Sequence, residues 1–568
     1  MQEGISQTRK FLTWQRLLIV ALVYCIVTLS FRPTSLLGFV ASGDDTSYIS
    51  HAFTIGLDLD LDYRNEPIFL PGDHQMTPSG LAPAHPVGSG LMAAPFVAFF
   101  SLFDRAAGNP IITDHKNYAE SWSLFGFFIA AASWFLFGLW LYLDVFEAIG
   151  AKTNKWMILL LTSGIGLSYY VLVRPTMGHA FEFSAVAMVF WGAVRLLTPG
   201  KLNRAIPEIV MVAGMLLTML VRMADVNIIL LPLIVWGLLL LSNRGKWPTL
   251  KLRSDGSVLV ATGIVSLLIL IGFNLALYGV AFAGIGSTYG YTPFFSIPEG
   301  GPWAVAQEAV HNLPLLWPLL VTSEYGLIYS APILPAGCLA FVWLLVRDWS
   351  GNKWLAAVTL VACMLYAAVP LSTVLILRTT SESFGFRYLY DLLPPALLSL
   401  ALFLDQGPRR LVRFAQFGLT VLSLWALLGV AFTDTSPELA SRKDINSFGR
   451  YTPFSLVGYE TTLLKVIATP RGWFNLAARR FPGFVAVKFG AKQDDTVRAG
   501  ASLDFSNAQN TVVRIVQLRG SYVCAILLFW LLYPLCLVFL CDDVIKTEMV
   551  GLAERMHRRV FGVGQKYE

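Results

Sequence analysis

Apolar runs long enough to cross a lipid bilayer recur along this chain, and they constrain its fold more than any other feature. A spanning helix needs ~20 mainly apolar residues, and hydropathy predicts about twelve such helices. They are residues 14–31, 121–145, 157–173, 180–195, 206–221, 227–242, 257–278, 327–346, 354–376, 389–405, 414–432 and 521–541. Because 55% of the residues are hydrophobic and only 14% are charged, we predict an all-α multi-pass membrane protein.

Basic residues indicate how these helices are oriented. The first run follows Arg9 and Lys10, as in a signal peptide, but it is long and lacks a small-residue cleavage site, so we expect a retained helix. Five short basic segments then fall on one side of the membrane: AKTNK, RLLTPGKLNR, NRGKWPTLKLR, VRDWSGNK and DQGPRRLVR. Positive charge favours the cytoplasmic side, so both termini are predicted to be cytoplasmic.

Three long segments are predicted on the opposite side, namely 32–120, 279–326 and 433–520, and they hold most of the acidic residues. Any chemistry is therefore expected outside the cytoplasm. The predicted domains are a membrane domain over 1–432 that includes loop 32–120, a small outer domain over 433–520, and a last helix with a basic cytoplasmic tail over 521–568.

The first outer loop has two moderately apolar stretches, 46–57 and 87–103, which are too short to span and are expected to be helices lying in the membrane interface. The segment between them, PIFLPGDHQMTPSGLAPAHPVG, is rich in Pro and Gly, which disfavours regular structure. Alternating stretches such as FVAVKF and TVVRIVQL in 433–520 predict a β-containing outer domain.

Two adjacent acids, Asp44 and Asp45, follow the first apolar run at the predicted membrane edge. An ionised carboxylate there is costly unless it is hydrated, paired or used, so these acids are candidates for function. The alternative is a solvated N-cap for the helix that begins near Thr46.

Cations from distant parts of the chain are predicted at the same outer level. They are His85, Arg174, His179, Arg222, Arg378 and Arg387. A single arginine there often anchors to lipid headgroups, whereas several at helix ends that also carry Pro and Gly indicate a phosphate site.

Other residue patterns are less specific. Asp58, Asp60 and Asp62 alternate as at the start of a calcium loop, but the glycine and distal glutamate of an EF-hand are missing; in an extended segment the three would share one wet face. The cysteines have no metal-ligand or disulfide spacing. A net charge of +6 and basic residues gathered on the cytoplasmic side argue against nucleic-acid binding. The chain has no Walker, Rossmann, HExxH or nucleophile-elbow motif.

The order of these motifs resembles the GT-C superfamily of membrane glycosyltransferases, which includes the protein O-mannosyltransferases and the aminoarabinose transferase of lipid A. The stretches that carry the resemblance lie between about residues 35 and 400. They are GDDTSYISHA, LDLDYRNEP, RPTMGHAFEF, TSEYGLIYSAPIL and SFGFRYLYDLLPP, together with a His-Pro pair at the opening of the second interface helix.

This resemblance implies an inverting transferase in a bacterial inner membrane, with a polyprenyl-phosphate sugar as donor and an acceptor hydroxyl outside. Asp44 or Asp45 would be the general base. The donor phosphate would contact cations from the set His85, Arg174, His179, Arg378 and Arg387. Further substrate contacts would come from His51, Arg64, Asn65, Glu66, Arg222 and Glu324. No cofactor is predicted, and a divalent cation stays an alternative.

The acceptor and two rival functions remain open at this point. The chain has Asp-Asp where the O-mannosyltransferases have Asp-Glu, and it lacks their β-trefoil insertion, so a surface glycan or lipid is favoured over protein as the acceptor. A transporter or flippase would place ionisable groups near the bilayer midplane, often in repeated halves, and neither feature is visible. An O-antigen ligase or polymerase would rely on outer-loop arginine and histidine without an acid after the first span.

Overall fold

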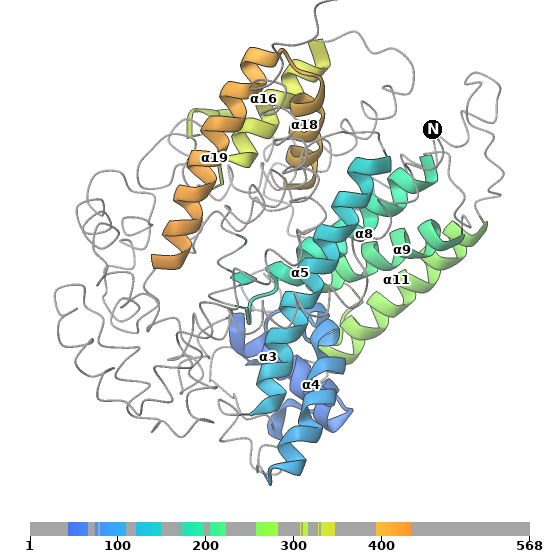
Figure 1. The fold of residues 1–568 in the computed structure, drawn as a ribbon. Helices are drawn as coiled ribbons and strands as arrows, with labels where there is room; N and C mark the ends of the chain where they lie inside the picture. Colours follow the sequence, from blue (N-terminus) through green and yellow to red (C-terminus); the bar gives the residue numbers. More distant parts are fainter. Residues whose placement is uncertain are drawn as a thin grey trace, which may run out of the picture.

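The computed structural model describes residues 44–65, 74–77, 80–108, 121–148, 175–197, 205–222, 257–281, 310–315, 331–346 and 393–432, and the single positions 167, 170, 171, 307 and 328. This part of the chain is mostly helical (Figure 1). The predicted β-containing domain over 433–520 lies outside the described residues, as do the predicted spans 14–31, 227–242, 354–376 and 521–541 and nearly all of 157–173.

The first loop begins with α3 (Asp44–Phe53), which continues into a π-helical turn η2 (Thr54–Asp58) and ends where Leu59 adopts a left-handed conformation with φ 61°. A short 3-10 turn η3 (Tyr63–Asn65) follows. The helix expected over 46–57 is therefore present, although its last turn is wider than an α-helix.

The Pro- and Gly-rich segment that follows contains regular structure, contrary to the prediction. Strands β1 (His74–Thr77) and β2 (Gly80–Pro83) pair as an antiparallel hairpin. Gly80 has φ 125°, which only glycine adopts readily, so it ends the turn instead of preventing the strands. The Thr77 hydroxyl lies 2.7 Å from the Leu277 carbonyl oxygen and so ties the hairpin to a helix 200 residues away.

Helices α4 (Gly88–Ala106) and α5 (Trp122–Ala148) run antiparallel. The rings of Phe100 and Phe125 pack edge to face, and the Trp134 indole donates to the Met92 carbonyl oxygen at 3.1 Å. At the turn between the helices, the Asp104 carboxylate accepts hydrogen bonds from the backbone N–H groups of residues 122 and 123, both at 2.8 Å, and so caps α5. The helix predicted over 87–103 is therefore present as α4. It runs antiparallel to the first half of α5, whereas a helix lying in the membrane interface would cross a spanning helix at a large angle.

Helix α8 (His179–Leu197) packs against α5, α9 (Ala205–Val221) packs against α8, and α11 (Ser257–Tyr278) packs against α9 (Figure 1). Phe127 pairs with Phe181 and Asp144 binds Arg195, so α5 and α8 run parallel. Glycines at the crossing of α8 and α9 leave almost no space: a Cβ on Gly214 would lie 2.8 Å from the Ala185 carbonyl oxygen.

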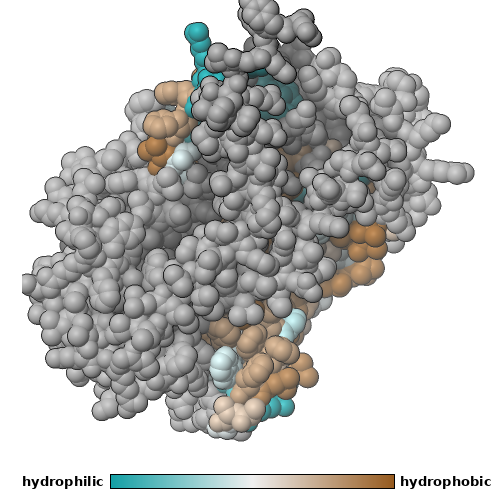
Figure 2. All heavy atoms as spheres, viewed as in Figure 1, coloured by the Kyte–Doolittle hydropathy of each residue, from teal (hydrophilic) through white to brown (hydrophobic). Residues whose placement is uncertain are grey.

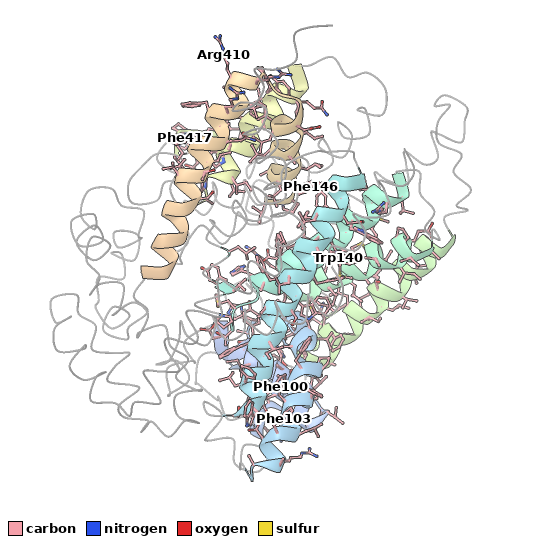
Figure 3. All side chains as sticks on the ribbon, viewed as in Figure 1. Phe100, Phe103, Trp140, Phe146, Arg410 and Phe417 are labelled. Atoms are coloured by element: carbon pink, nitrogen blue, oxygen red, sulfur yellow. The ribbon has the colours of Figure 1, made fainter. Side chains whose placement is uncertain are left out.

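A second group consists of α16 (Ile333–Val346), α18 (Leu393–Gln406) and α19 (Arg409–Phe432). Helices α16 and α18 are parallel, because Gly337 approaches Ala396 and Trp343 contacts Phe403. Arg410 and Phe417 both project from α19, Arg410 at one end of it (Figure 3). The predicted cytoplasmic loop 405–413 is therefore helical from Arg409, because Pro408 precedes the first turn and arginine is a good helix former.

One described helix, Trp122–Phe146, is long and apolar enough to cross a membrane. Shorter apolar helices cover Ala205–Val221, Gly263–Tyr278, Ile333–Leu344 and Ala396–Gln406. Apolar side chains such as Leu268 on α11 and Phe414 on α19 are 62% and 75% exposed. Figure 2 shows this kind of apolar surface over α4 and along α11. Water is a poor solvent for such surfaces, whereas lipid covers them without cost.

Candidate functional site

Asp45 lies in the first turn of α3 and is fully buried. Its Oδ1 accepts a hydrogen bond of 2.6 Å from the hydroxyl of Thr176, which is 131 residues away in the turn that precedes α8. A carboxylate held inside the protein by a distant segment is not a solvated helix cap, so for Asp45 that alternative is wrong. Asp44 begins α3, and its side chain lies outside the described residues.

His179, Glu182 and the partly buried Arg222 form a hydrogen-bonded group where α8 begins and α9 ends. His179 Nδ1 lies 2.9 Å from Glu182 Oε2, and Arg222 Nη1 donates to Glu182 Oε1, also at 2.9 Å. The Glu182 side chain is 3% exposed. The ring of Tyr170 covers His179 with a centroid separation of 4.6 Å.

Glu182 was not among the residues predicted from the sequence. The available signals were an acid inside an otherwise apolar run and its position three residues after His179, which puts both side chains on one helix face. Its pairing with Arg222 had no sequence signal, because the two residues are 40 positions apart and meet only when α8 and α9 pack together.

His85 lies between β2 and α4, and its backbone is held from two sides. Its carbonyl oxygen accepts a hydrogen bond from His51 Nε2 at 2.9 Å and another from the Tyr278 hydroxyl at 3.1 Å. Its ring packs against Tyr48, with centroids 5.4 Å apart. Two helices distant in the sequence, α3 and α11, therefore fix the position of His85.

His51 was predicted to contact substrate, but in this structure it supports the His85 backbone. The ring is fully buried, and because Nε2 faces a carbonyl oxygen it must carry a proton. In the neutral ring Nδ1 then accepts a hydrogen bond from the Tyr63 hydroxyl at 2.6 Å. Both nitrogens bind protein groups, which leaves the ring with a positioning role.

Glycines let these segments approach one another. A Cβ on Gly88 would lie 2.3 Å from the backbone nitrogen of Val221, next to Arg222, so the start of α4 touches the end of α9. A Cβ on Gly178 would lie 2.8 Å from Ser89 Oγ and 3.5 Å from the Tyr48 hydroxyl oxygen. The structure thus gathers residues from four segments, which we call the polar cluster: Asp45, His85, Thr176, His179, Glu182 and Arg222.

The polar cluster combines a buried carboxylate with cationic groups. Arg222 can donate up to five N–H hydrogen bonds in one plane, and each histidine can carry a positive charge. Ser89 Oγ, at the start of α4, is buried and has no hydrogen-bond partner among the residues that the structure describes. The arrangement can bind an anion beside a group that accepts protons.

No family model, curated protein or solved structure matches the chain.

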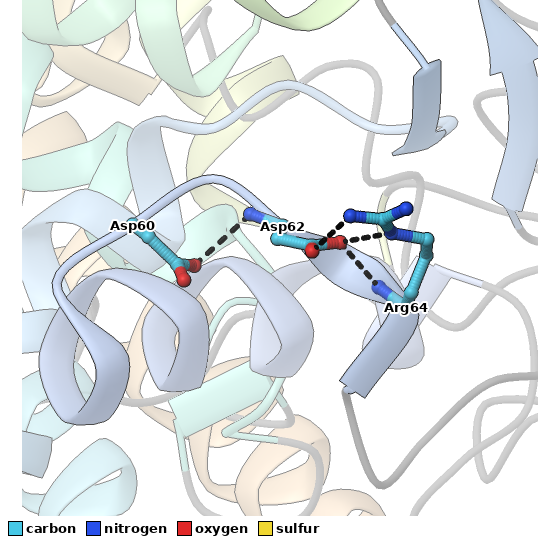
Figure 4. Close-up of polar contacts among 3 residues, drawn as sticks. All are labelled: Asp60, Asp62 and Arg64. Carbon is cyan, nitrogen blue, oxygen red and sulfur yellow. Dashed lines mark hydrogen bonds and ion pairs between the residues drawn. The ribbon is translucent and has the colours of Figure 1, made fainter.

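Arg64, another predicted contact, belongs to an exposed ion pair in the first loop. Asp62 accepts hydrogen bonds from the Arg64 backbone N–H at 3.1 Å and from its Nε at 2.8 Å, and Asp60 accepts one from the Asp62 backbone N–H at 3.0 Å (Figure 4). The Arg64 guanidinium lowers the pKa of Asp62 from 3.8 to about 2.

The alternating aspartates do not form the extended face that was expected. Asp58 lies in η2, whereas Asp60 and Asp62 bind backbone groups of the turn after it. Within the part of the chain that the structure describes, no group of three His, Cys, Asp or Glu side chains is arranged to hold a metal ion.

The side chains of the remaining predicted site residues lie outside the described part of the chain. Asn65 lies in η3, but its side chain is outside the described residues. Glu66, Arg174, Glu324, Arg378 and Arg387 also lie outside them. Of the predicted donor-phosphate and acid residues, the structure therefore brings together Asp45, His85 and His179, with Arg222 beside them.

Proposed function

We propose that this protein is a multi-pass membrane glycosyltransferase of the GT-C type. It has about twelve spanning helices and transfers a sugar from a polyprenyl phosphate to a hydroxyl of a surface glycan or lipid, on the outer face of a bacterial inner membrane. The observation that supports this most directly is the burial of Asp45 beside the turn that leads to His179, at the level where α9 ends in Arg222.

In this reaction Asp45 acts as the general base. It takes the proton of the acceptor hydroxyl while that oxygen forms a bond to the anomeric carbon, and the bond from this carbon to the phosphate oxygen breaks. A positioned base of this kind contributes ~10²–10⁴ in rate. Attack from the side opposite the phosphate inverts the anomeric centre.

The leaving group is a lipid phosphate, which departs as a stable anion and needs no protonating acid. It needs cations that stabilise its developing charge. Arg222 and His179 meet that need from the ends of two helices, and the N-terminus of α8 adds a favourable dipole. This chemistry requires one base and no protonating acid, so the second buried carboxylate of the polar cluster, Glu182, can be bound to Arg222 and His179 instead of acting as the acid of a glycosidase.

The proposed function is tested by replacing Asp45 with a side chain of the same size that cannot take up the proton. Asp45→Asn should lower sugar transfer ~10²–10⁴-fold in membranes supplied with a polyprenyl-phosphate-linked sugar, while the protein inserts and purifies normally. Asp44→Asn shows whether the neighbouring acid shares the role. Asp60→Asn, in the exposed turn of the same loop, is the control and should retain activity.

Transfer that persists in the Asp45→Asn/Asp44→Asn double variant would remove the assignment. The sugar and its acceptor can be identified by mass analysis of surface glycans from a strain that lacks the protein, because the missing residue names both. A transporter would instead move a labelled solute into proteoliposomes that contain no acceptor.

A further inference from the structure

The two carboxylate oxygens of Glu182 each bind a different basic side chain. Oε2 faces His179 Nδ1 and Oε1 accepts from Arg222 Nη1, both at 2.9 Å. Arg222 lies directly after the last residue of α9, and its backbone N–H continues that helix by donating to the Thr218 carbonyl oxygen at 2.8 Å. Glu182 therefore connects the first turn of α8 to the last turn of α9.

A buried carboxylate in an apolar helix is costly unless each oxygen has a partner. Position alone favours Glu182 somewhat, because an acid in the first turn of a helix interacts with its dipole. To join α8 to α9, however, Glu182 needs to bind only one side chain, that of Arg222. The second partner, His179, belongs to the same helix as Glu182, so that contact adds nothing to the α8–α9 connection.

What the contact to His179 does is orient the ring. With Nδ1 facing a carboxylate, a neutral ring carries its proton on Nδ1, and the ring plane is fixed by this hydrogen bond. In the same way the bond through Nη1 sets the plane of the Arg222 guanidinium, whose remaining donors are rigidly placed in that plane.

We propose that Glu182 is a positioning residue that fixes the orientation of His179 and Arg222 for the phosphate of the lipid-linked donor. This rests on the proposed function, which it deepens by assigning the phosphate-binding end of the site to the junction of α8 and α9. In this arrangement His179 and Arg222 lie between Glu182 and the donor phosphate, and Glu182 does not contact the donor.

Asp144 offers a matched control at the opposite end of α8. This carboxylate also joins two side chains across a helix pair, accepting hydrogen bonds from Trp191 Nε1 at 2.6 Å and Arg195 Nε at 2.8 Å. Glu182→Gln and Asp144→Asn thus remove the same charge from similar pairs. A merely structural role predicts equal behaviour, whereas a positioning role predicts a defect in donor binding for Glu182→Gln alone.

The experiment measures binding separately from transfer. Purified full-length protein is titrated with a polyprenyl monophosphate that carries no sugar, with the neutral polyprenol and inorganic phosphate as comparisons, and binding is followed by thermal stabilisation. Loss of a charge-assisted hydrogen-bond pair should weaken binding of the lipid phosphate about 10- to 100-fold in Glu182→Gln. Asp144→Asn should bind as the wild type does, although it unfolds at a lower temperature.

Steady-state kinetics provide a second readout. In Glu182→Gln the donor KM should rise by a similar factor, while the acceptor KM stays within about twofold of the wild-type value. Wild-type affinity for the lipid phosphate in Glu182→Gln would overturn the proposal. So would equal weakening in the Asp144→Asn control, because that would show a general effect of packing.

A double variant controls for misfolding of Glu182→Gln, which leaves the partly buried Arg222 with one partner fewer. Glu182→Gln/Arg222→Gln removes both of these charges, so the guanidinium is not left without its carboxylate. Because Glu182 acts in part through Arg222, the loss of lipid-phosphate binding in this double variant should be smaller than the sum of the two single losses. Single losses that add fully would contradict the proposal.

The outcomes also separate this inference from the proposed function. Glu182-dependent binding of the lipid phosphate without any sugar transfer by the wild type would refute the transferase and retain the phosphate site. Sugar transfer by the wild type together with unchanged lipid-phosphate binding in Glu182→Gln would refute the inference alone.

Discussion

Carboxylates in this protein behave differently according to their surroundings. Asp45 and Glu182 are buried and bind side chains from distant segments, so their contacts depend on the packing of whole helices. Asp62 is partly exposed and binds a residue two positions away. An exposed pair of this kind contributes little to stability, but it shapes the turn after η2, and its effect on the Asp62 carboxyl group can be measured.

Because the Asp62 pKa is lowered, the pair is expected to persist throughout the physiological pH range. Its stabilising effect is fully present above the ordinary pKa of 3.8 and is lost as the pH falls through about 2. A carboxyl ¹³C NMR titration of selectively labelled protein should place the Asp62 midpoint near 2. In Arg64→Met the midpoint should return towards 3.8; an unchanged midpoint would contradict the assigned cause.

At the scale of elements, closely approaching glycines decide how the helices around the polar cluster pack. A Cβ on Gly192 would lie 2.6 Å from the Pro207 carbonyl oxygen, and one on Gly214 would lie 2.8 Å from the Val189 backbone nitrogen, so α8 and α9 approach through small residues on both sides. Small residues at helix crossings are typical of membrane proteins, where close packing replaces the hydrophobic effect. The Glu182–Arg222 contact at the end of this crossing depends on it.

Gly214→Ala should therefore separate α8 from α9. The added methyl group meets backbone atoms, which cannot rotate away, so we expect a loss of about 1–3 kcal/mol in the free energy of unfolding and weaker substrate binding through Arg222. Gly272→Ala on α11 is the matched control, because a Cβ there has no neighbour within 4 Å in the described part of the chain. Unfolding in detergent mixtures measures both, and equal stability of the two variants would contradict this account.

At the scale of the whole molecule, ionic groups lie at both ends of α8 with buried, mainly apolar residues between them. His179 and Glu182 occupy one end, and Arg195, bound to Asp144 of α5, occupies the other. The 17 residues from His179 to Arg195 span about 24 Å of helix, somewhat less than the ~30 Å hydrocarbon core of a bilayer. Figure 3 places Phe100 and Phe103 at the far end of α4, well away from Arg410 on α19.

The proposed topology puts the exposed turn near Asp60 outside the cell and the start of α19 inside. In a variant whose six native cysteines have been replaced, a membrane-impermeant maleimide should label Asp60→Cys in intact cells. Arg409→Cys should be labelled only after the membrane is opened. Labelling of Arg409→Cys in intact cells would reverse the orientation and exclude the polar cluster from the outer face.

The sequence by itself located most of the described helices. The runs predicted at 121–145, 180–195, 206–221 and 257–278 correspond closely to α5, α8, α9 and α11. Hydropathy works for such segments because each helix satisfies its own backbone and only its apolar length has to be recognised. Hydropathy missed the start of α19, where polar residues continue the helix. The Pro- and Gly-rich composition likewise hid the hairpin that Gly80 closes.

Sequence patterns also singled out Asp45, His85, His179 and Arg222 as residues expected at one level. Only the tertiary structure decided that Thr176 binds Asp45, that Glu182 joins His179 to Arg222, and that His51 supports the backbone of His85. These contacts join residues far apart in the chain, and they form only because glycines allow α3, α4, α8 and α9 to approach within backbone contact. Local patterns cannot encode that proximity, since it is a property of several helices packed at once.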